Sequence, residues 1–158
     1  MRTRAGAGVA EPYHFEDFAV GTVFRSGRRR LDAERIKSFA AEFDPQPQHL
    51  DEADAAASQF GELVASGWHT ASLSMRLFTD TVPPVPGGGM GLGVERLVWP
   101  RPVRPGDELR VEAEVTDVRP SHSRPDKGVV ALRVTTLNQR DETVQSFTTA
   151  VMVPRRAA

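Results

Sequence analysis

An apolar stretch in the middle of the chain constrains the possible folds most. From Gly67 to about Thr81, apolar side chains recur at helical spacing over a surface wide enough to predict a largely buried helix. Prolines and three successive glycines between residues 83 and 89 end this helix and predict a loop. The apolar side chains of the predicted helix are Trp68, Ala71, Leu73, Met75, Leu77, Phe78 and Val82.

After this loop the pattern changes to that of β-strands. Between Val111 and Thr116 apolar and polar residues alternate, which is the period of a strand with one buried face. Further strands are predicted for Met90 to Trp99, Gly128 to Leu137 and Glu142 to Val153, and the last two are joined as a hairpin. A buried helix followed by an antiparallel meander predicts an α+β fold, with the helix on one face of a curled sheet.

The length and composition fit one globular domain. The chain has 158 residues, of which 39% are hydrophobic and 26% are charged. We expect residues 1–11 to form a flexible tail and residues 12–158 to form a single domain. The tail has no apolar run long enough for a signal peptide or a membrane helix, and the chain has no cysteine. We therefore expect a cytoplasmic protein that does not bind membranes.

The charge pattern argues against a nucleic-acid partner. Twenty Lys and Arg residues balance 21 Asp and Glu residues, so no net field would attract a polyanion. Arg28, Arg29 and Arg30 end a predicted strand from Val20 to Arg30, but no aromatic residues are interleaved with them to stack on bases. We interpret the three arginines as a solvated face that discourages pairing at a sheet edge.

A second amphipathic helix is predicted between Asp32, its N-cap, and Asp44. Pro45 disfavours a helical conformation at the preceding residue, so the helix should end there and Asp44 to His49 should form a rigid loop. Asp51 is then expected to cap a short helix through Ala57. The apolar residues with helical spacing in the first of these helices are Ile36, Phe39, Ala40 and Phe43.

The loop places a carboxylate and an imidazole close together at Asp44 and His49. Acid–base catalysis needs such a pair, because one group must take a proton while another delivers one. The negative end of the preceding helix dipole should discourage ionisation of Asp44 and favour it as a proton donor. On the sequence alone an alternative remains, since aspartates in loops are often turn-formers or helix caps.

A second candidate feature is the sequence Ser66-Gly67-Trp68 at the start of the long helix. Unpaired N–H groups and the positive dipole end can stabilise an enolate oxygen at such a position. Because Gly67 has no side chain, a substrate carbonyl could approach its N–H closely. The alternative is that Gly67 only allows the chain to turn into the helix.

The segment Phe43 to Asp51 resembles the signature of the MaoC-like and (R)-specific enoyl-CoA hydratase family. That signature reads Asp-x-Asn-Pro-x-His, followed downstream by His-Gly at the central helix, and Asp44, Pro47 and His49 match it. The similarity covers nearly the whole chain after about residue 12 and includes the approach to the meander at 101–107. It implies a hot-dog fold, a long helix wrapped by a curled antiparallel sheet, and reversible addition of water to a 2-enoyl thioester.

The resemblance also implies roles for individual residues. Asp44 and His49 would activate water, and the Gly67 N–H would form an oxyanion hole. We assign His49 as the base and Asp44 as the proton donor, although a coupled pair could divide these roles in reverse.

The chain departs from the signature at three positions. Gln46 stands in place of the asparagine, Ser66 in place of the histidine, and Met75 where some members have a serine. We expect Gln46 still to bridge the loop, and we expect Ser66 and Met75 to alter acyl-chain preference without affecting the acid–base pair.

Further substrate contacts are expected from Gln46, Ser66, Trp68 and His69, although His69 could simply be a packed histidine. Arg124 and Lys127 are candidates for binding the phosphates of coenzyme A, and the alternative for both is a solvated turn.

The spacing of the acidic and histidine side chains near the loop matches no familiar metal site, so we expect neither a metal nor an organic cofactor, coenzyme A being part of the substrate. These side chains are Asp44, His49, Asp51 and His69.

Two alternative functions keep the same fold. One is hydrolysis of an acyl-CoA thioester, for which hot-dog proteins usually carry an acidic residue on the central helix, and Asp80 lies too near the helix end to fit well. The other is a non-catalytic subunit that binds acyl thioesters. In every case we expect an acyl-CoA partner and a second copy of the chain paired across sheet edges, as a homodimer or a dimer of dimers, with the active site near the interface.

Overall fold

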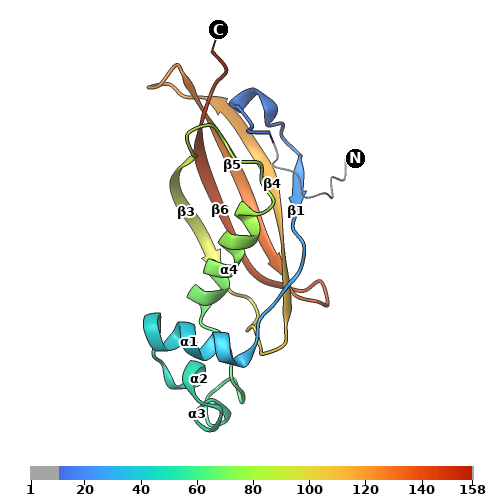
Figure 1. Cartoon of the computed structure of the whole chain (residues 1–158), viewed down its shortest axis with the longest axis vertical. Coiled ribbons are helices and arrows are strands. Elements are labelled where there is room, and N and C mark those ends of the chain that lie inside the picture. Colours follow the sequence, from blue (N-terminus) through green and yellow to red (C-terminus); the bar gives the residue numbers. More distant parts are fainter. Residues whose placement is uncertain (1–10, 158) are drawn as a thin grey trace.

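The computed structural model describes residues 11–157, which form an open antiparallel sheet with helices at one face and one end (Figure 1). The strand order is β1-β4-β5-β6-β3, and β2 also pairs with β4. None of the described helices is long and apolar enough to cross a membrane. The elements are η1 (Phe15–Asp17), β1 (Val23–Arg25), β2 (Arg29–Arg30), α1 (Ala33–Phe43), α2 (Pro47–Leu50), α3 (Glu52–Ala56), α4 (Gly67–Thr79), β3 (Met90–Val98), β4 (Glu108–Pro120), β5 (Lys127–Leu137) and β6 (Thr143–Pro154).

The predicted α+β arrangement of a long helix against an antiparallel sheet is confirmed. The tail that we expected over residues 1–11 lies outside the described residues except for Glu11. That residues 12–158 form a single domain stays a prediction.

The core lies between α4 and the sheet and follows the predicted alternation on β4. Leu109, Val111, Ala113 and Val115 are fully buried, while the residues between them are more exposed. Their burial contributes hydrophobic stabilisation to this face of the sheet.

The helix α4 is less buried than its sequence predicted. Trp68 and Met75 are 58% and 47% exposed, whereas the buried residues of the helix include Thr70 and Ser74. Ser74 Oγ lies 2.6 Å from Thr136 Oγ1 of β5, so part of the contact between helix and sheet is polar. The prediction of a largely buried helix was wrong because only one face of α4 packs on the sheet within residues 11–157.

The order of the strands differs from a simple meander. Strands β4, β5 and β6 follow one another as antiparallel neighbours, but β3 pairs with β6 instead of β4. The connection from Trp99 to Asp107 contains three prolines and crosses the end of the sheet to reach its other side (Figure 1). A tight β3–β4 hairpin is excluded because this connection is too long and too stiff. As a result β3 and β1 form the two edges of the open sheet.

The N-terminal helices follow their capping signals. The Asp32 carboxylate accepts a 2.9 Å hydrogen bond from Arg35 N–H at the start of α1, and Asp51 caps α3 in the same way. The prediction of a rigid loop from Asp44 to His49 was wrong in part, because Pro47 begins the short helix α2. Proline is favoured at the first helical position, where its missing N–H costs nothing.

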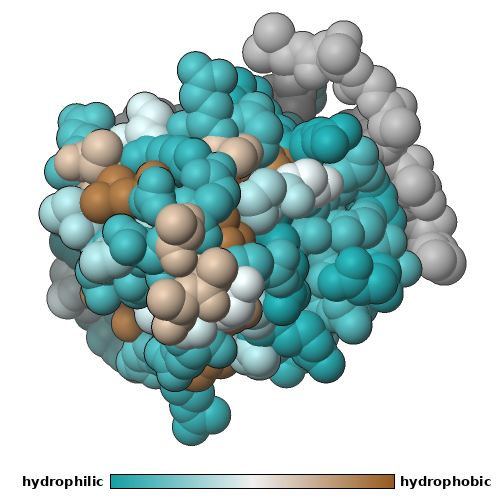
Figure 2. All heavy atoms as spheres, turned by 90° about the horizontal axis from the view of Figure 1, so that it is seen from below, coloured by the Kyte–Doolittle hydropathy of each residue, from teal (hydrophilic) through white to brown (hydrophobic). Residues whose placement is uncertain are grey.

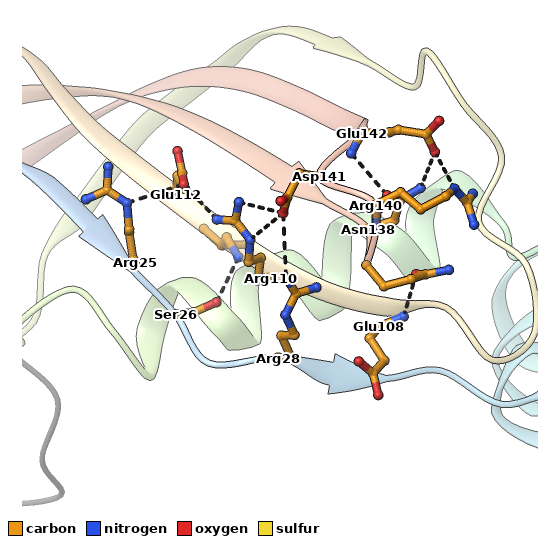
Figure 3. A network of polar contacts seen from close by, with 12 residues as sticks. Arg25, Ser26, Arg28, Glu108, Arg110, Glu112, Asn138, Arg140, Asp141 and Glu142 are labelled. Carbon is orange, nitrogen blue, oxygen red and sulfur yellow. Dashed lines mark hydrogen bonds and ion pairs between the residues drawn. The ribbon is translucent and has the colours of Figure 1, made fainter.

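A polar network on the sheet involves the arginine run that we expected to be solvated. Arg110 bridges Glu112 and Asp141, and Arg28 approaches Asp141 Oδ1 at 3.6 Å (Figure 3). Arg29–Arg30 forms the short strand β2, which pairs with β4, and the effect of the run on pairing at the outer sheet edge stays a prediction. The side chains remain in contact with solvent, which keeps these ion pairs weak.

A substitution at Gly128 tests how tightly η1 packs on the sheet. A Cβ at Gly128 would overlap the ring of Phe15, whereas a Cβ at Gly27 would meet nothing within 4 Å. We expect Gly128→Ala to lower the free energy of unfolding by about 1–3 kcal/mol, since the Phe15 ring must move. Urea unfolding of the two alanine variants measures the difference, and equal stabilities would contradict this packing.

Candidate active site

Asp44 lies directly after α1, where two side chains donate hydrogen bonds to its carboxylate. Ser66 Oγ lies 2.6 Å from Oδ2, and Gln46 Nε2 lies 2.7 Å from Oδ1. These donors, the Ser66 hydroxyl first, lower the pKa of Asp44 below its ordinary value. We predicted the opposite from the helix dipole. That prediction was wrong because two direct hydrogen bonds to the charged form outweigh a partial charge.

His49 lies on α2 with its ring almost completely buried and in a defined orientation. Its Nδ1 is 2.7 Å from the carbonyl oxygen of Val64. A carbonyl can only accept a hydrogen bond, so Nδ1 carries a proton and Nε2 is the atom left to exchange one. Nε2 lies 3.6 Å from Asp44 Oδ2. The two groups that the sequence singled out are therefore neighbours.

Ser66 connects this pair to the start of α4. Its hydroxyl donates to Asp44 and accepts a 3.2 Å hydrogen bond from Trp68 N–H, which makes Ser66 the N-cap of the helix. We expected Ser66 to influence only the acyl preference, and this was wrong because its hydroxyl donates a hydrogen bond to the Asp44 carboxylate. Gln46 does bridge the loop as predicted.

The N–H of Gly67 has no hydrogen-bond acceptor among the described residues. It lies in the first turn of α4, where backbone N–H groups and the helix dipole favour a negative charge. Gly67 follows Ser66 directly, so this donor lies beside the Asp44 and His49 pair.

Trp99, which no sequence pattern singled out, explains why residue 67 is a glycine. Three atoms of the Trp99 indole lie 2.7–2.9 Å from the position that a Cβ of Gly67 would occupy. Trp68 also packs edge-on against this indole, with ring centroids 5.5 Å apart. Trp99 Nε1 donates a 2.8 Å hydrogen bond to Gln145 Oε1. Neither Trp99 nor Gln145 belongs to a recognisable local motif, so no signal along the chain could have found them.

Trp68 and His69, two of the expected substrate contacts, lie in different surroundings. Trp68 is exposed beside Trp99, whereas His69 stacks on Phe39 of α1 at 4.5 Å between ring centroids. Burial, followed by the nearby Arg35, lowers the pKa of His69. His69 is thus a packed side chain between α1 and α4, as the alternative interpretation stated. Within residues 11–157 no three His, Asp or Glu side chains form a group that could hold a metal ion.

Arg124 and Lys127 lie far from the pair within one chain. They occupy the β4–β5 hairpin, at the opposite end of the sheet from α1 to α3 (Figure 1). There they line a 170 Å³ cavity with Met90 and Met152, and Asp126 lies 3.5 Å from Arg124 and 4.0 Å from Lys127. Their role in binding phosphate stays a prediction.

A larger cavity lies beside the second half of α4. Its volume is 380 Å³, and its walls are mainly apolar side chains of the helix, the sheet and the loop before β3. Met75 lies on the wall and is eight residues beyond Gly67, which is roughly 12 Å along the helix axis. The cavity therefore lies about two helical turns from the start of α4.

Comparison with known proteins shows the family of the chain. The family model described as the MaoC like domain matches residues 17–138. This chain belongs to that family. The solved structure of a MaoC-like dehydratase from Rhodospirillum rubrum is 52% identical, covers 92% of this chain and 99% of its own, and superposes with a TM-score of 0.87.

Two further relatives connect the family to an activity and a fold. The 3-hydroxybutyryl-CoA dehydratase of Methylorubrum extorquens is 30% identical over 144 residues, which is 90% of this chain and 85% of that protein. A protein from Mycobacterium tuberculosis described as a double hot-dog fold is 22% identical with a TM-score of 0.74, and the match covers 92% of this chain and 45% of that one. The predicted hot-dog fold is confirmed, with an open sheet.

Ser66→Ala tests the cause of the lowered pKa of Asp44. We expect the pKa to rise toward its ordinary value, because the strongest donor to the carboxylate is lost. Ser72→Ala is the matched control, since Ser72 Oγ donates to the Trp68 carbonyl on the same helix and has no other hydrogen bond within residues 11–157. Carbon-13 NMR titration of the Asp44 carboxyl group measures its pKa in the two variants.

The same variant has a predicted effect on stability. A depressed folded pKa stabilises the protein above the unfolded pKa of aspartate, and this contribution is lost as the pH falls through the folded value. The pH-dependent part of the destabilisation of Ser66→Ala should therefore be present at neutral pH and disappear in strong acid. An unchanged pKa of Asp44 would contradict the assignment.

Proposed function

We propose that this chain is a hydratase that reversibly adds water to a 2-enoyl thioester of coenzyme A. The observation that carries the proposal is the distance of 3.6 Å between Asp44 Oδ2 and His49 Nε2, beside the start of α4. A water oxygen about 2.8 Å from both atoms fits as the third corner of a triangle. The coenzyme A dehydratase among the relatives supports the substrate class.

The lowered pKa of Asp44 supports a division of roles opposite to the one that we assigned from the sequence. Asp44, which stays ionised, accepts a proton from water while the hydroxide adds to C3 of the enoyl group. Protonated His49 donates from Nε2 to C2. Transfer of the proton from Asp44 to His49 then restores the starting state, and dehydration follows the same steps in reverse.

The start of α4 supplies the third element of the proposed mechanism. Addition at C3 moves negative charge onto the thioester oxygen, and the free N–H of Gly67 would donate a hydrogen bond to it. The acyl chain would extend along α4 into the 380 Å³ apolar cavity beside Met75. All groups in this scheme belong to the chain or the substrate, so the proposed reaction uses no cofactor.

Substitution of the pair tests the mechanism. We expect Asp44→Asn and His49→Ala to lower kcat/KM by about 10²–10⁴ on enoyl-CoA substrates, because each removes a proton-transfer group. Asp54→Asn, at an exposed position, is the matched control and should retain the parent rate. The assay follows the loss of enoyl-thioester absorbance over a panel of short, medium and branched acyl chains.

The outcomes separate the alternatives. Full activity of the Asp44 and His49 variants would contradict the mechanism. Release of free thiol without hydration would indicate a thioesterase, although Asp80 caps α4 and pairs with Arg76 at 3.0 Å. Thioester binding without any turnover would indicate a non-catalytic binding subunit.

We further propose that two copies pair along β3. The outer edge of β3 has no strand partner among the described residues, and its exposed side chains include Leu92, Val94 and Val98. Viewed from the end that carries α1 to α3, apolar side chains gather in the left half of the surface, whereas the right half is hydrophilic (Figure 2). An unpaired apolar edge favours association with a symmetric copy.

Symmetric pairing would also bring distant residues together. Two-fold symmetry makes paired edge strands antiparallel, so the Met90 end of one β3 would lie beside the Val98 end of the other. The hairpin with Arg124 and Lys127 would then approach the Asp44 site of the second copy. This supports a role for these cations in binding the phosphates of coenzyme A.

A charge at the edge should prevent this pairing. We expect Val94→Glu to shift the chain from dimer to monomer, because two carboxylates would be buried in the interface. Val20→Glu is the matched control, since Val20 is 61% exposed and does not lie on β3. Light scattering after gel filtration measures the mass, and a Val94→Glu dimer would contradict the proposed interface.

A further inference from the structure

Gln145 is a fully buried amide that the structure satisfies only in part. Its Oε1 accepts the hydrogen bond from Trp99 Nε1 at 2.8 Å, and its Nε2 has no partner among the described residues. An indole nitrogen can only donate, so the amide cannot be turned to exchange the two atoms. Burying an unpaired donor lowers stability. Burial of Gln145 therefore lowers the free energy of unfolding, and its single hydrogen bond does not explain why an amide stands there.

The position of Gln145 in the sheet directs its side chain toward α4. Gln145 of β6 pairs with Thr136 of β5, and side chains of directly opposed residues lie on the same face of a sheet. Thr136 contacts Ser74 of α4. Gln145 consequently lies on the face that α4 covers.

Trp99 connects this amide to the start of the helix. It follows the last residue of β3, and its indole occupies the space beside the Gly67 Cα at 2.7–2.9 Å from an ideal Cβ. Trp68 packs on the same indole at an interplanar angle of 78°. The first turn of α4 is thus held against a side chain whose own orientation depends on Gln145.

We propose that Trp99 and Gln145 are positioning residues that fix the direction of the Gly67 N–H during the reaction. The inference rests on the proposed function, in which this N–H binds the thioester oxygen. Neither residue contacts Asp44 or His49 by a hydrogen bond, so both act through the backbone at Gly67. An oxyanion donor is effective only when it points at the developing charge within a narrow range of distance and angle. Loss of the Gln145–Trp99 hydrogen bond would free the indole and loosen that alignment.

The test combines Trp99→Phe, Gln145→Met and the double variant. We expect each to lower kcat about 10- to 100-fold, with little change in KM, because alignment matters most in the transition state. The double variant should lose no more than either single one, since both remove the same hydrogen bond. The pH profile of kcat/KM should keep the parent shape, and Gln145→Met should be at least as stable as the parent.

Ser74→Ala is the matched control, because it removes a buried polar contact under the same helix without touching Trp99. It should lower the melting temperature and leave kcat within about twofold of the parent. Unchanged kcat in Trp99→Phe and Gln145→Met, or losses that multiply in the double variant, would overturn the proposal.

A second measurement keeps the inference separate from the proposed function. If the parent hydrates none of the thioesters, the proposed function fails, and nitrogen-15 NMR of the Gly67 amide then decides the positioning role. Its signal should shift in Trp99→Phe and in Gln145→Met and stay in place in Ser74→Ala. A Gly67 signal that stays at the parent position in the first two variants overturns the inference.

Discussion

The hydroxyl group of Ser66 is the contact on which the candidate site depends. It donates to Asp44 and at the same time accepts from Trp68 N–H, so one side chain connects the loop after α1 to the first turn of α4. A hydroxyl has one proton and two lone pairs, which allows both bonds together. The carboxylate, its lowered pKa and the free N–H of Gly67 are therefore parts of one arrangement.

The same region shows how polar groups are tolerated under a helix. The hydroxyl groups of Ser74 and Thr136 bond to each other at 2.6 Å, whereas Gln145 Nε2 has no partner in the part of the chain that the structure describes. The hydrogen bond between Ser74 and Thr136 contributes to stability, whereas the unpaired Gln145 Nε2 lowers it. Buried groups that lower stability are more often found near sites of function than elsewhere in a core. The unpaired amide of Gln145 therefore favours a functional role for the side of α4 that packs on Trp99.

Much of the fold followed from local patterns. The alternation on β4, the caps at Asp32 and Asp51 and the length of α4 are local signals, and the structure confirms them. The position of β3 beside β6 could not be predicted, because strand order depends on contacts between segments far apart in the chain. The pair of Asp44 and His49 was found because both lie on one proline-stiffened segment.

The sequence by itself determined most of the helices and strands and singled out Asp44 and His49 as a candidate acid–base pair, since period, capping and proline act over a few residues. Only the tertiary structure decided the ionisation of Asp44, which is set by a hydroxyl 22 residues away. It also decided why residue 67 is a glycine, because the indole of Trp99 occupies the space that a Cβ would need. Hydrogen bonds and close packing act over a few ångströms in space, and separation along the chain carries no information about that distance.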